Sequence, residues 1–242
     1  MRLTYGVLWC AVLALAAMNL FIWQGVLAHT SQELMVSFLD IGQGDSVLVQ
    51  GPTGIQMLID GGPDRSVLRE LPSELGLMDR SIDLVVETHP DKDHIAGLAG
   101  IFDRYAVSYF LGPGIPNDTS FTRALDAAGS EEPKLHSFVA RRGMRIHLGG
   151  GAYADVLYPD RDVSKVATND GSVTMRVVYG STSFMLSGDL SSPQEDGKVK
   201  IREPDFMKPD GTLNEPYASR YPAYQAYTKA MMPSTEKFAK SD

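Results

Sequence analysis

The order of apolar and polar positions divides the chain into three parts. Residues 5–28 form an apolar run, residues 34–190 alternate short apolar runs with turn residues, and residues 191–242 show neither pattern. The last part is rich in proline, and its eight basic and eight acidic side chains balance. We therefore expect an N-terminal membrane anchor (1–30), one folded domain (34–190) and a loosely ordered tail (191–242).

Most apolar runs in the folded part have the length of strands. Strands are expected at 34–40, 46–50, 55–60, 81–88, 107–111, 135–140, 144–148, 153–158, 172–179 and 182–186. Helices are expected around 67–75, although Pro72 interrupts that stripe, over 93–104, and after a cap at Asp118 or Thr119. Strands outnumber helices, which predicts a layered α/β or α+β domain with helices packed on the outside of sheets.

The N-terminal run has the composition of a membrane-spanning helix. Residues 5–28 are 24 residues without a charged side chain, and a spanning helix needs about 20. Trp9 and Trp23 lie towards its ends, where aromatic rings favour the membrane interface, and Arg2 precedes it. The positive-inside bias then predicts a single-pass protein whose domain is extracytoplasmic. The alternative is a signal peptide cleaved after Ala28, but the run is longer than a usual signal core, which favours an uncleaved anchor.

Charge and cysteine content narrow the function classes. The formal net charge is −8, whereas dedicated nucleic-acid binders usually present a basic stripe. An enzyme that meets a polyanion through metal ions is compatible with this charge. Cys10 is the single cysteine and lies in the apolar run, so the chain has no internal disulfide framework and no cysteine zinc cluster.

The clearest candidate chemistry is a cluster of four metal-ligand side chains: His89, Asp91, Asp93 and His94. Alternate side chains of an extended segment point the same way, so His89 and Asp91 can converge on one point, with Asp93 and His94 on a neighbouring one. Imidazole and carboxylate together suit Zn²⁺, Mn²⁺ or iron. The alternative, that both histidines are ordinary surface side chains, leaves the crowded carboxylates without an offsetting cation.

Further candidates lie at the ends of other expected strands. Asp189 ends the run 182–189 and is expected to join the site, where a carboxylate can bridge two cations. Asp40, Asp45 and Asp60 also follow strands, and they either serve turns or support the histidine loop. His136 and His147 lie inside strand-like runs and are expected to be structural.

Several segments together resemble a known family. Residues 38–46 (FLDIGQGDS), 58–62 (LIDGG), 88–98 (THPDKDHIAGL), 169–173 (NDGSV) and 184–189 (FMLSGD) resemble, in this order, motifs of the metallo-β-lactamase superfamily. Within it they are most similar to the C-terminal domain of ComEC-type DNA-uptake proteins. The resemblance implies an αββα sandwich and a two-metal hydrolase that acts on phosphodiesters. It implies metal ligands at His89, Asp91, Asp93, His94 and Asp189, with Asp93 and Asp189 catalytic.

The chain also departs from the family pattern. Asp91 replaces the second histidine of the His-x-His-x-Asp-His signature, and Asn169 or Asp170 lies where other branches have a histidine. No histidine follows His147, and the tail from Ser191 does not resemble the family, so the sandwich is expected to be incomplete at its C-terminus.

These patterns predict a membrane-anchored, metal-dependent hydrolase that binds one or two Zn²⁺ or Mn²⁺ ions and acts on phosphodiesters or DNA. Two alternatives come from different classes. One is a degenerate domain that binds metal or nucleotide without catalysis, and the other is a hydrolase of small molecules such as lactones or β-lactams.

Overall fold

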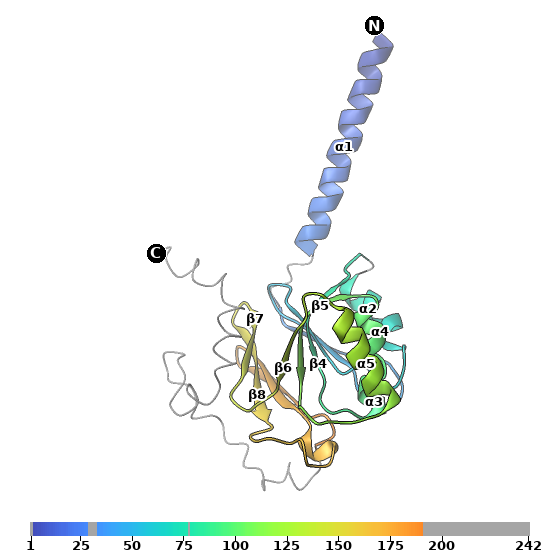
Figure 1. Ribbon diagram of the computed structural model, residues 1–242. Coiled ribbons are helices and arrows are strands. Elements are labelled where there is room, and N and C mark those ends of the chain that lie inside the picture. The colour runs from blue at the N-terminus through green and yellow to red at the C-terminus, as the bar shows by residue number, and fades with distance from the viewer. Residues whose placement is uncertain (1, 29–32, 77, 191–242) are drawn as a thin grey trace.

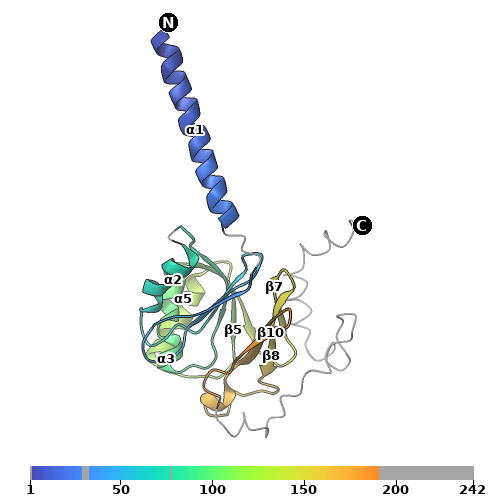
Figure 2. The same cartoon turned by 180° about the vertical axis from the view of Figure 1, so that it is seen from behind.

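Two facing β-sheets, with helices on the outer face of one of them, make up the body of the protein (Figures 1 and 2). The computed structural model describes residues 2–28, 33–76 and 78–190. The expected tail therefore lies outside the described residues. Within them the mixed α/β layered architecture is confirmed, in the order helices, sheet, sheet.

The first sheet has six strands in sequence order. They are β1 (Met35–Phe38), β2 (Val47–Gln50), β3 (Gln56–Ile59), β4 (Ser81–Val86), β5 (Ala106–Gly112) and β6 (His136–Val139). The first three strands pair antiparallel, whereas β3 to β6 are parallel. The parallel strands need crossover connections, and the chain uses them to place its helices on one face of this sheet.

The second sheet is an antiparallel meander. Its order is β10 (Thr182–Leu186), β9 (Thr174–Tyr179), β8 (Ala152–Tyr158) and β7 (Arg145–Gly149). The expected strand 172–179 begins two residues late. Residues 169–171 form a short 3-10 helix, η1 (Asn169–Gly171), and the Val173 amide donates to the Thr88 carbonyl at 2.8 Å. This bond joins the second sheet to the end of β4 in the first.

The two faces of the first sheet bury separate apolar cores. Val49, Val86 and Leu111 face Ala154 and Val177 of the second sheet. On the other face, residues of β2, β3 and β4 pack against α2 (Val67–Leu75), α4 (Leu98–Phe102) and α5 (Ser120–Glu131). The strands contribute Leu48, Leu58, Ile82 and Val85 to this core, and the helices contribute Leu71, Ile101 and Leu125. Both β3 and β4 are therefore covered on two sides, which is typical of parallel strands.

The helices differ from expectation in one important place. Helix α2 continues through Pro72, while the expected helix 93–104 is divided into α3 (Lys92–Ile95) and α4. The His94 carbonyl accepts from the Gly61 amide at 2.7 Å, so it does not bond to Leu98 one turn on. A Cβ at Gly97 would lie 2.0 Å from the Gly61 carbonyl oxygen, so only glycine permits this approach. The break holds the histidine loop against the end of β3.

Helix α1 (Arg2–Ala28) covers the apolar N-terminal run and projects away from the sandwich in both views (Figures 1 and 2). Its described side chains, at residues 6, 7 and 9–21, are exposed. Among the described residues, no helix meets the length and hydropathy expected of a membrane span.

Candidate metal centre

The candidate site is assembled from segments that follow strands of both sheets. Asp60 follows β3, Thr88 and His89 follow β4, and Asp189 follows β10. Because β3 and β4 are parallel, their carboxyl ends meet at the same edge of the sheet. His94 reaches the same place from α3.

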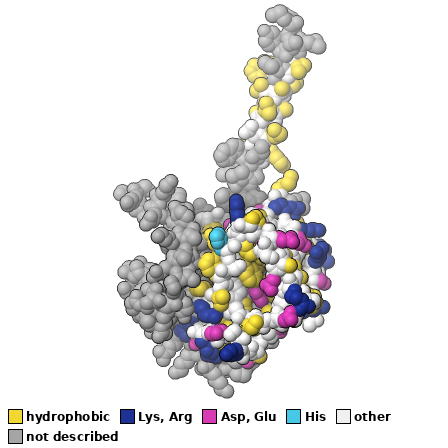
Figure 3. Space-filling model, in the orientation of Figure 1, with side chains coloured by type: hydrophobic (Ala, Val, Ile, Leu, Met, Phe, Trp, Pro, Cys, Tyr) yellow, Lys and Arg dark blue, Asp and Glu magenta, His cyan; other side chains and the backbone are white. Residues whose placement is uncertain are grey.

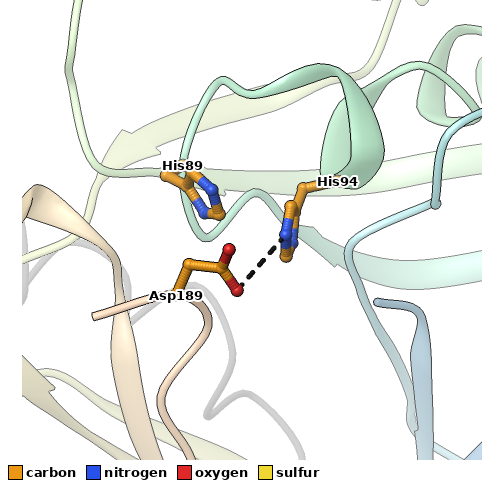
Figure 4. Close-up of side chains that lie close together, drawn as sticks. All are labelled: His89, His94 and Asp189. Atoms are coloured by element: carbon orange, nitrogen blue, oxygen red, sulfur yellow. Dashed lines mark ion pairs between the residues drawn. The ribbon is translucent and has the colours of Figure 1, made fainter. Parts of the chain in front are cut away.

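Three side chains bring metal-ligand atoms to one point. One ligand atom each of His89, His94 and Asp189 lies within 4.8 Å of the others (Figure 4). The Nε2 atom of His94 lies 3.5 Å from Asp189 Oδ1. Both histidine side chains are buried, whereas the Asp189 side chain is 43% exposed. The three side chains therefore form a site that opens to solvent on the aspartate side.

Asp60 orients both imidazole rings from behind. Its Oδ2 accepts from His94 Nδ1 at 2.7 Å and from the Thr88 hydroxyl at 2.6 Å, while its Oδ1 accepts from the Thr88 amide at 2.8 Å. Since the single Thr88 hydroxyl proton goes to Asp60, the Thr88 oxygen accepts from His89 Nδ1, 3.0 Å away. Each ring thus carries its proton on Nδ1 when neutral, and each Nε2 keeps a lone pair directed into the site.

The donor set fits a divalent cation. His89 Nε2 is buried and has no hydrogen-bond partner among the described residues, although buried polar atoms are nearly always paired. It faces a second imidazole nitrogen and a carboxylate, a combination that binds Zn²⁺ or Mn²⁺. A cation at this point would satisfy the unpaired nitrogen and offset the aspartate charges.

The charges around the site shift the two histidines in opposite directions. Burial by itself lowers the pKa of His94, but the hydrogen bond and charge of Asp60, with Asp189 and Asp45, raise it to about 9. Burial and the neighbouring His94 lower the pKa of His89. Burial also raises the pKa of Asp45, and the charges of Asp60 and Asp189 add to that rise. An anionic pocket of this kind holds a proton on His94 that a metal ion would displace.

The structure distributes the five expected ligands unevenly. His89, His94 and Asp189 come together, and Asp91 is near them, with its Oδ2 3.7 Å from His89 Nε2. Asp91 also accepts from the Thr168 hydroxyl at 3.1 Å. Asp93, in the first turn of α3, is half-buried and is not one of the three grouped side chains. The ligand roles of Asp91 and Asp93 and the catalytic roles of Asp93 and Asp189 stay predictions.

Two glycines let the loops of the site approach closely. Gly44 has φ +91°, and a Cβ there would lie 2.0 Å from the Asp93 carbonyl oxygen. Gly188 has φ +52°, and a Cβ there would lie 2.9 Å from the Thr88 side chain. Asp60 itself has φ 58°, a left-handed conformation that aspartate and asparagine tolerate better than most residues. The backbone at the site is therefore shaped to bring these segments together.

The residues that orient the metal ligands are harder to predict from the sequence than the ligands themselves. The sequence leaves Asp60 and Asp45 open between turn and supporting roles, and the hydrogen bonds of the Asp60 carboxylate favour a supporting role for Asp60. The role of Thr88 was missed, although its position directly before His89 at a strand end is a usable signal. His136 stacks on Tyr109 with ring centroids 5.6 Å apart, and His147 lies in β7; neither belongs to the grouped ligands.

Several known proteins are similar to this chain in sequence or in fold. The chain is 26% identical over 189 residues to ComE operon protein 3 of Bacillus subtilis (strain 168). This alignment covers 71% of this chain and 24% of that protein. The chain thus spans about a quarter of the relative's length. Among solved structures it is similar to a metallo-beta-lactamase of Cronobacter sakazakii, with 17% identity, a TM-score of 0.45, and coverage of 65% of this chain and 57% of the other. It is also similar to Zn²⁺-bound PqqB of Methylobacterium extorquens, with 15% identity, a TM-score of 0.42, and coverage of 60% and 55%.

The match to the family extends further than the resemblance read from the motifs. The sequence model of the metallo-beta-lactamase superfamily matches residues 39–237, and so includes most of the part expected to be an unrelated tail. That match covers well over half of the chain, and the fold implies binding of a divalent metal. The chain belongs to the metallo-beta-lactamase superfamily.

Proposed function

We propose that this chain is a metal-dependent hydrolase that cleaves phosphodiester bonds, including those of DNA. The observation that carries the proposal is the convergence of His89, His94 and Asp189, with both imidazole Nε2 atoms directed into one solvent-accessible site. The choice of phosphodiesters is supported by the likeness of the motifs to ComEC-type DNA-uptake proteins.

The residues of the site have separable tasks in this proposal. Asp60 and Thr88 fix the two imidazoles, so that the ligand atoms need little rearrangement on binding. A divalent ion at the site would supply a water molecule of lowered pKa and polarise a phosphoryl oxygen. Asp189, on the exposed side, would hold the ion through one carboxylate oxygen, and its other oxygen could accept a hydrogen bond from that water. Without a cation, Asp45, Asp91 and Asp189 repel a phosphate group.

The test is hydrolysis of bis(4-nitrophenyl) phosphate and single-stranded DNA by the full chain, with Mn²⁺ or Zn²⁺ supplied. We expect turnover below the typical enzyme rate of about 10 per second, because residues 148–242 contain no histidine that could match the family's late one. His94→Ala should abolish both metal binding and turnover. His136→Ala, outside the site, is the matched control and should change neither. Turnover that survives in His94→Ala would contradict the proposal.

A second candidate function is metal binding without turnover. The observation that favours it is again the absence of histidine from residues 148–242, since losing a ligand weakens metal binding and opens a coordination position to water. Elemental analysis separates the two candidates: stoichiometric metal with no hydrolysis of phosphodiesters, lactones or β-lactams would select the second.

We also propose that residues 5–28 anchor the domain outside a membrane. The uncharged length of 24 residues and the positions of Trp9 and Trp23 support this. N-terminal sequencing of the membrane fraction tests it. A chain that begins at His29 would instead indicate a cleaved signal peptide.

A further inference from the structure

A second cavity, separate from the metal centre, lies on the helix-covered face of the first sheet. It has a volume of about 480 Å³ and opens between α5 and the adjoining strands β5 and β6. Its apolar walls include Phe102, Phe110, Leu125, Leu135, Phe138 and Val139. Figure 3 shows hydrophobic side chains gathered in a hollow on this face, with acidic side chains beside them. The volume falls within the range of about 300–1,000 Å³ typical of small-molecule sites.

Small residues keep this space open. Gly112, Gly129, Ser130 and Ser137 line it where larger side chains would fill it. A Cβ at Gly129 on α5 would meet only the Leu135 side chain, at an ordinary 3.4 Å. Larger side chains at these positions would therefore reduce the cavity.

Two carboxylates face the same space. Glu87, directly after β4, and Asp126, on α5, both line this cavity and the adjoining one of about 760 Å³. The Glu87 carboxylate lies close to Gly112, where a Cβ would be 3.0 Å from its Oε2. Neither side chain has a hydrogen bond or ion pair with a described residue, and none of the described residues lining the 480 Å³ cavity is basic. Arg123, the basic side chain that lines the adjoining cavity, is paired with Asp118. Burial, with the charges of Asp60 and Asp126, raises the pKa of Glu87 to about 8, so Glu87 is mostly protonated at neutral pH, and a cation beside it would favour its ionised form.

We propose that this cavity binds a small organic ammonium ion, with its apolar body against the phenylalanine and leucine side chains and its charge facing Glu87 and Asp126. Aromatic ring faces attract cations, and Phe102 and Phe110 contribute rings whose centroids are 6.1 Å apart. Charge complementarity selects this ligand class, because a cation can pair with Asp126 and favours ionisation of Glu87, whereas an anion would be repelled by Asp126 and a neutral molecule would leave its charge without a partner.

The test measures binding of three probes of similar shape to the full chain by isothermal titration calorimetry, with detergent present. The probes are phenethylammonium, the neutral 2-phenylethanol and the anionic 3-phenylpropionate. We expect the ammonium ion to bind at least about tenfold more tightly than the alcohol, a difference of about 1.4 kcal/mol, and the anion not to bind. Equal binding of the ammonium ion and the alcohol, or no binding of the ammonium ion, would overturn the proposal.

Three variants locate the site. Asp126→Asn should weaken ammonium binding about tenfold, while Glu131→Gln, an equal charge change on an exposed part of α5, should leave it unchanged. Gly129→Leu should block the ammonium ion and the alcohol by filling the cavity, and helix propensity favours its folding. Equal losses in Asp126→Asn and Glu131→Gln, or unchanged binding in Gly129→Leu with a normal thermal transition, would place the binding elsewhere and refute the proposal.

Discussion

Replacement of Asp60 by asparagine isolates the contribution of one buried charge to the metal centre. Asp60 is 1% exposed and accepts three hydrogen bonds, two from Thr88 and one from His94. Its backbone φ of 58° is one that asparagine also tolerates. Asp60→Asn therefore changes the charge and the hydrogen bonds while adding little backbone strain.

The magnitude follows from the number of acceptor positions that are lost. If the asparagine oxygen replaces Oδ2, it can still accept from the Thr88 hydroxyl and from His94 Nδ1, but its amide group then faces the Thr88 amide donor. A buried donor left without an acceptor costs about 1–3 kcal/mol, so the metal-free variant should be less stable by that amount. Loss of a group that orients metal ligands typically weakens metal binding about 10–100-fold.

The assay combines urea unfolding of metal-free protein with a competitive chelator titration of Zn²⁺ or Mn²⁺. Asp155→Asn is the matched control, because Asp155 is also fully buried but pairs with Arg145, at 2.6 Å, in the second sheet. It should lower stability and leave metal affinity unchanged. If Asp60→Asn bound metal as tightly as the unmodified chain, Asp60 would not orient the ligands and the reasoning would be refuted.

Three further predictions concern the same site. Thr88→Val should lower stability by about 1–3 kcal/mol and weaken metal binding, because His89 Nδ1 and Asp60 both lose a hydrogen bond to the Thr88 hydroxyl. Thr182→Val, at an exposed position, should have neither effect, and equal effects of the two substitutions would contradict the role of Thr88. Gly44→Ala should displace the histidine loop and lower the amount of bound metal, since its Cβ would lie 2.0 Å from the Asp93 carbonyl oxygen. Gly54 has a similar φ but nothing within 4 Å of its Cβ position, so Gly54→Ala should retain metal, and full metal content in Gly44→Ala would contradict the prediction. The pKa of His94 is raised to about 9 from 6.5, so the protonated ring stabilises the metal-free fold below pH 6.5 and this contribution is lost as the pH rises towards 9; denaturation curves that show rising stability over that range would contradict it.

The sequence by itself determined most of the secondary structure and the core of the site. Alternating and continuous apolar runs predict all ten described strands, because a side-chain period of two and burial on both faces leave a local signature. The cluster from His89 to His94 can be recognised in the sequence because four potential metal ligands lie within six residues at a strand end. Such features depend on neighbours along the chain, so they are readable without a fold.

Only the tertiary structure decided which of those ligands meet. It joins His94 and Asp189, which are 95 positions apart in sequence, with Nε2 and Oδ1 at 3.5 Å, while Asp93, next to His94, is outside the group. It also divides the expected helix 93–104, because the His94 carbonyl finds a partner in Gly61 rather than one turn on. The tautomers of both histidines depend on Asp60, 29 and 34 positions away. Contacts of this range depend on how the sheet edges and loops pack, and no local pattern encodes them.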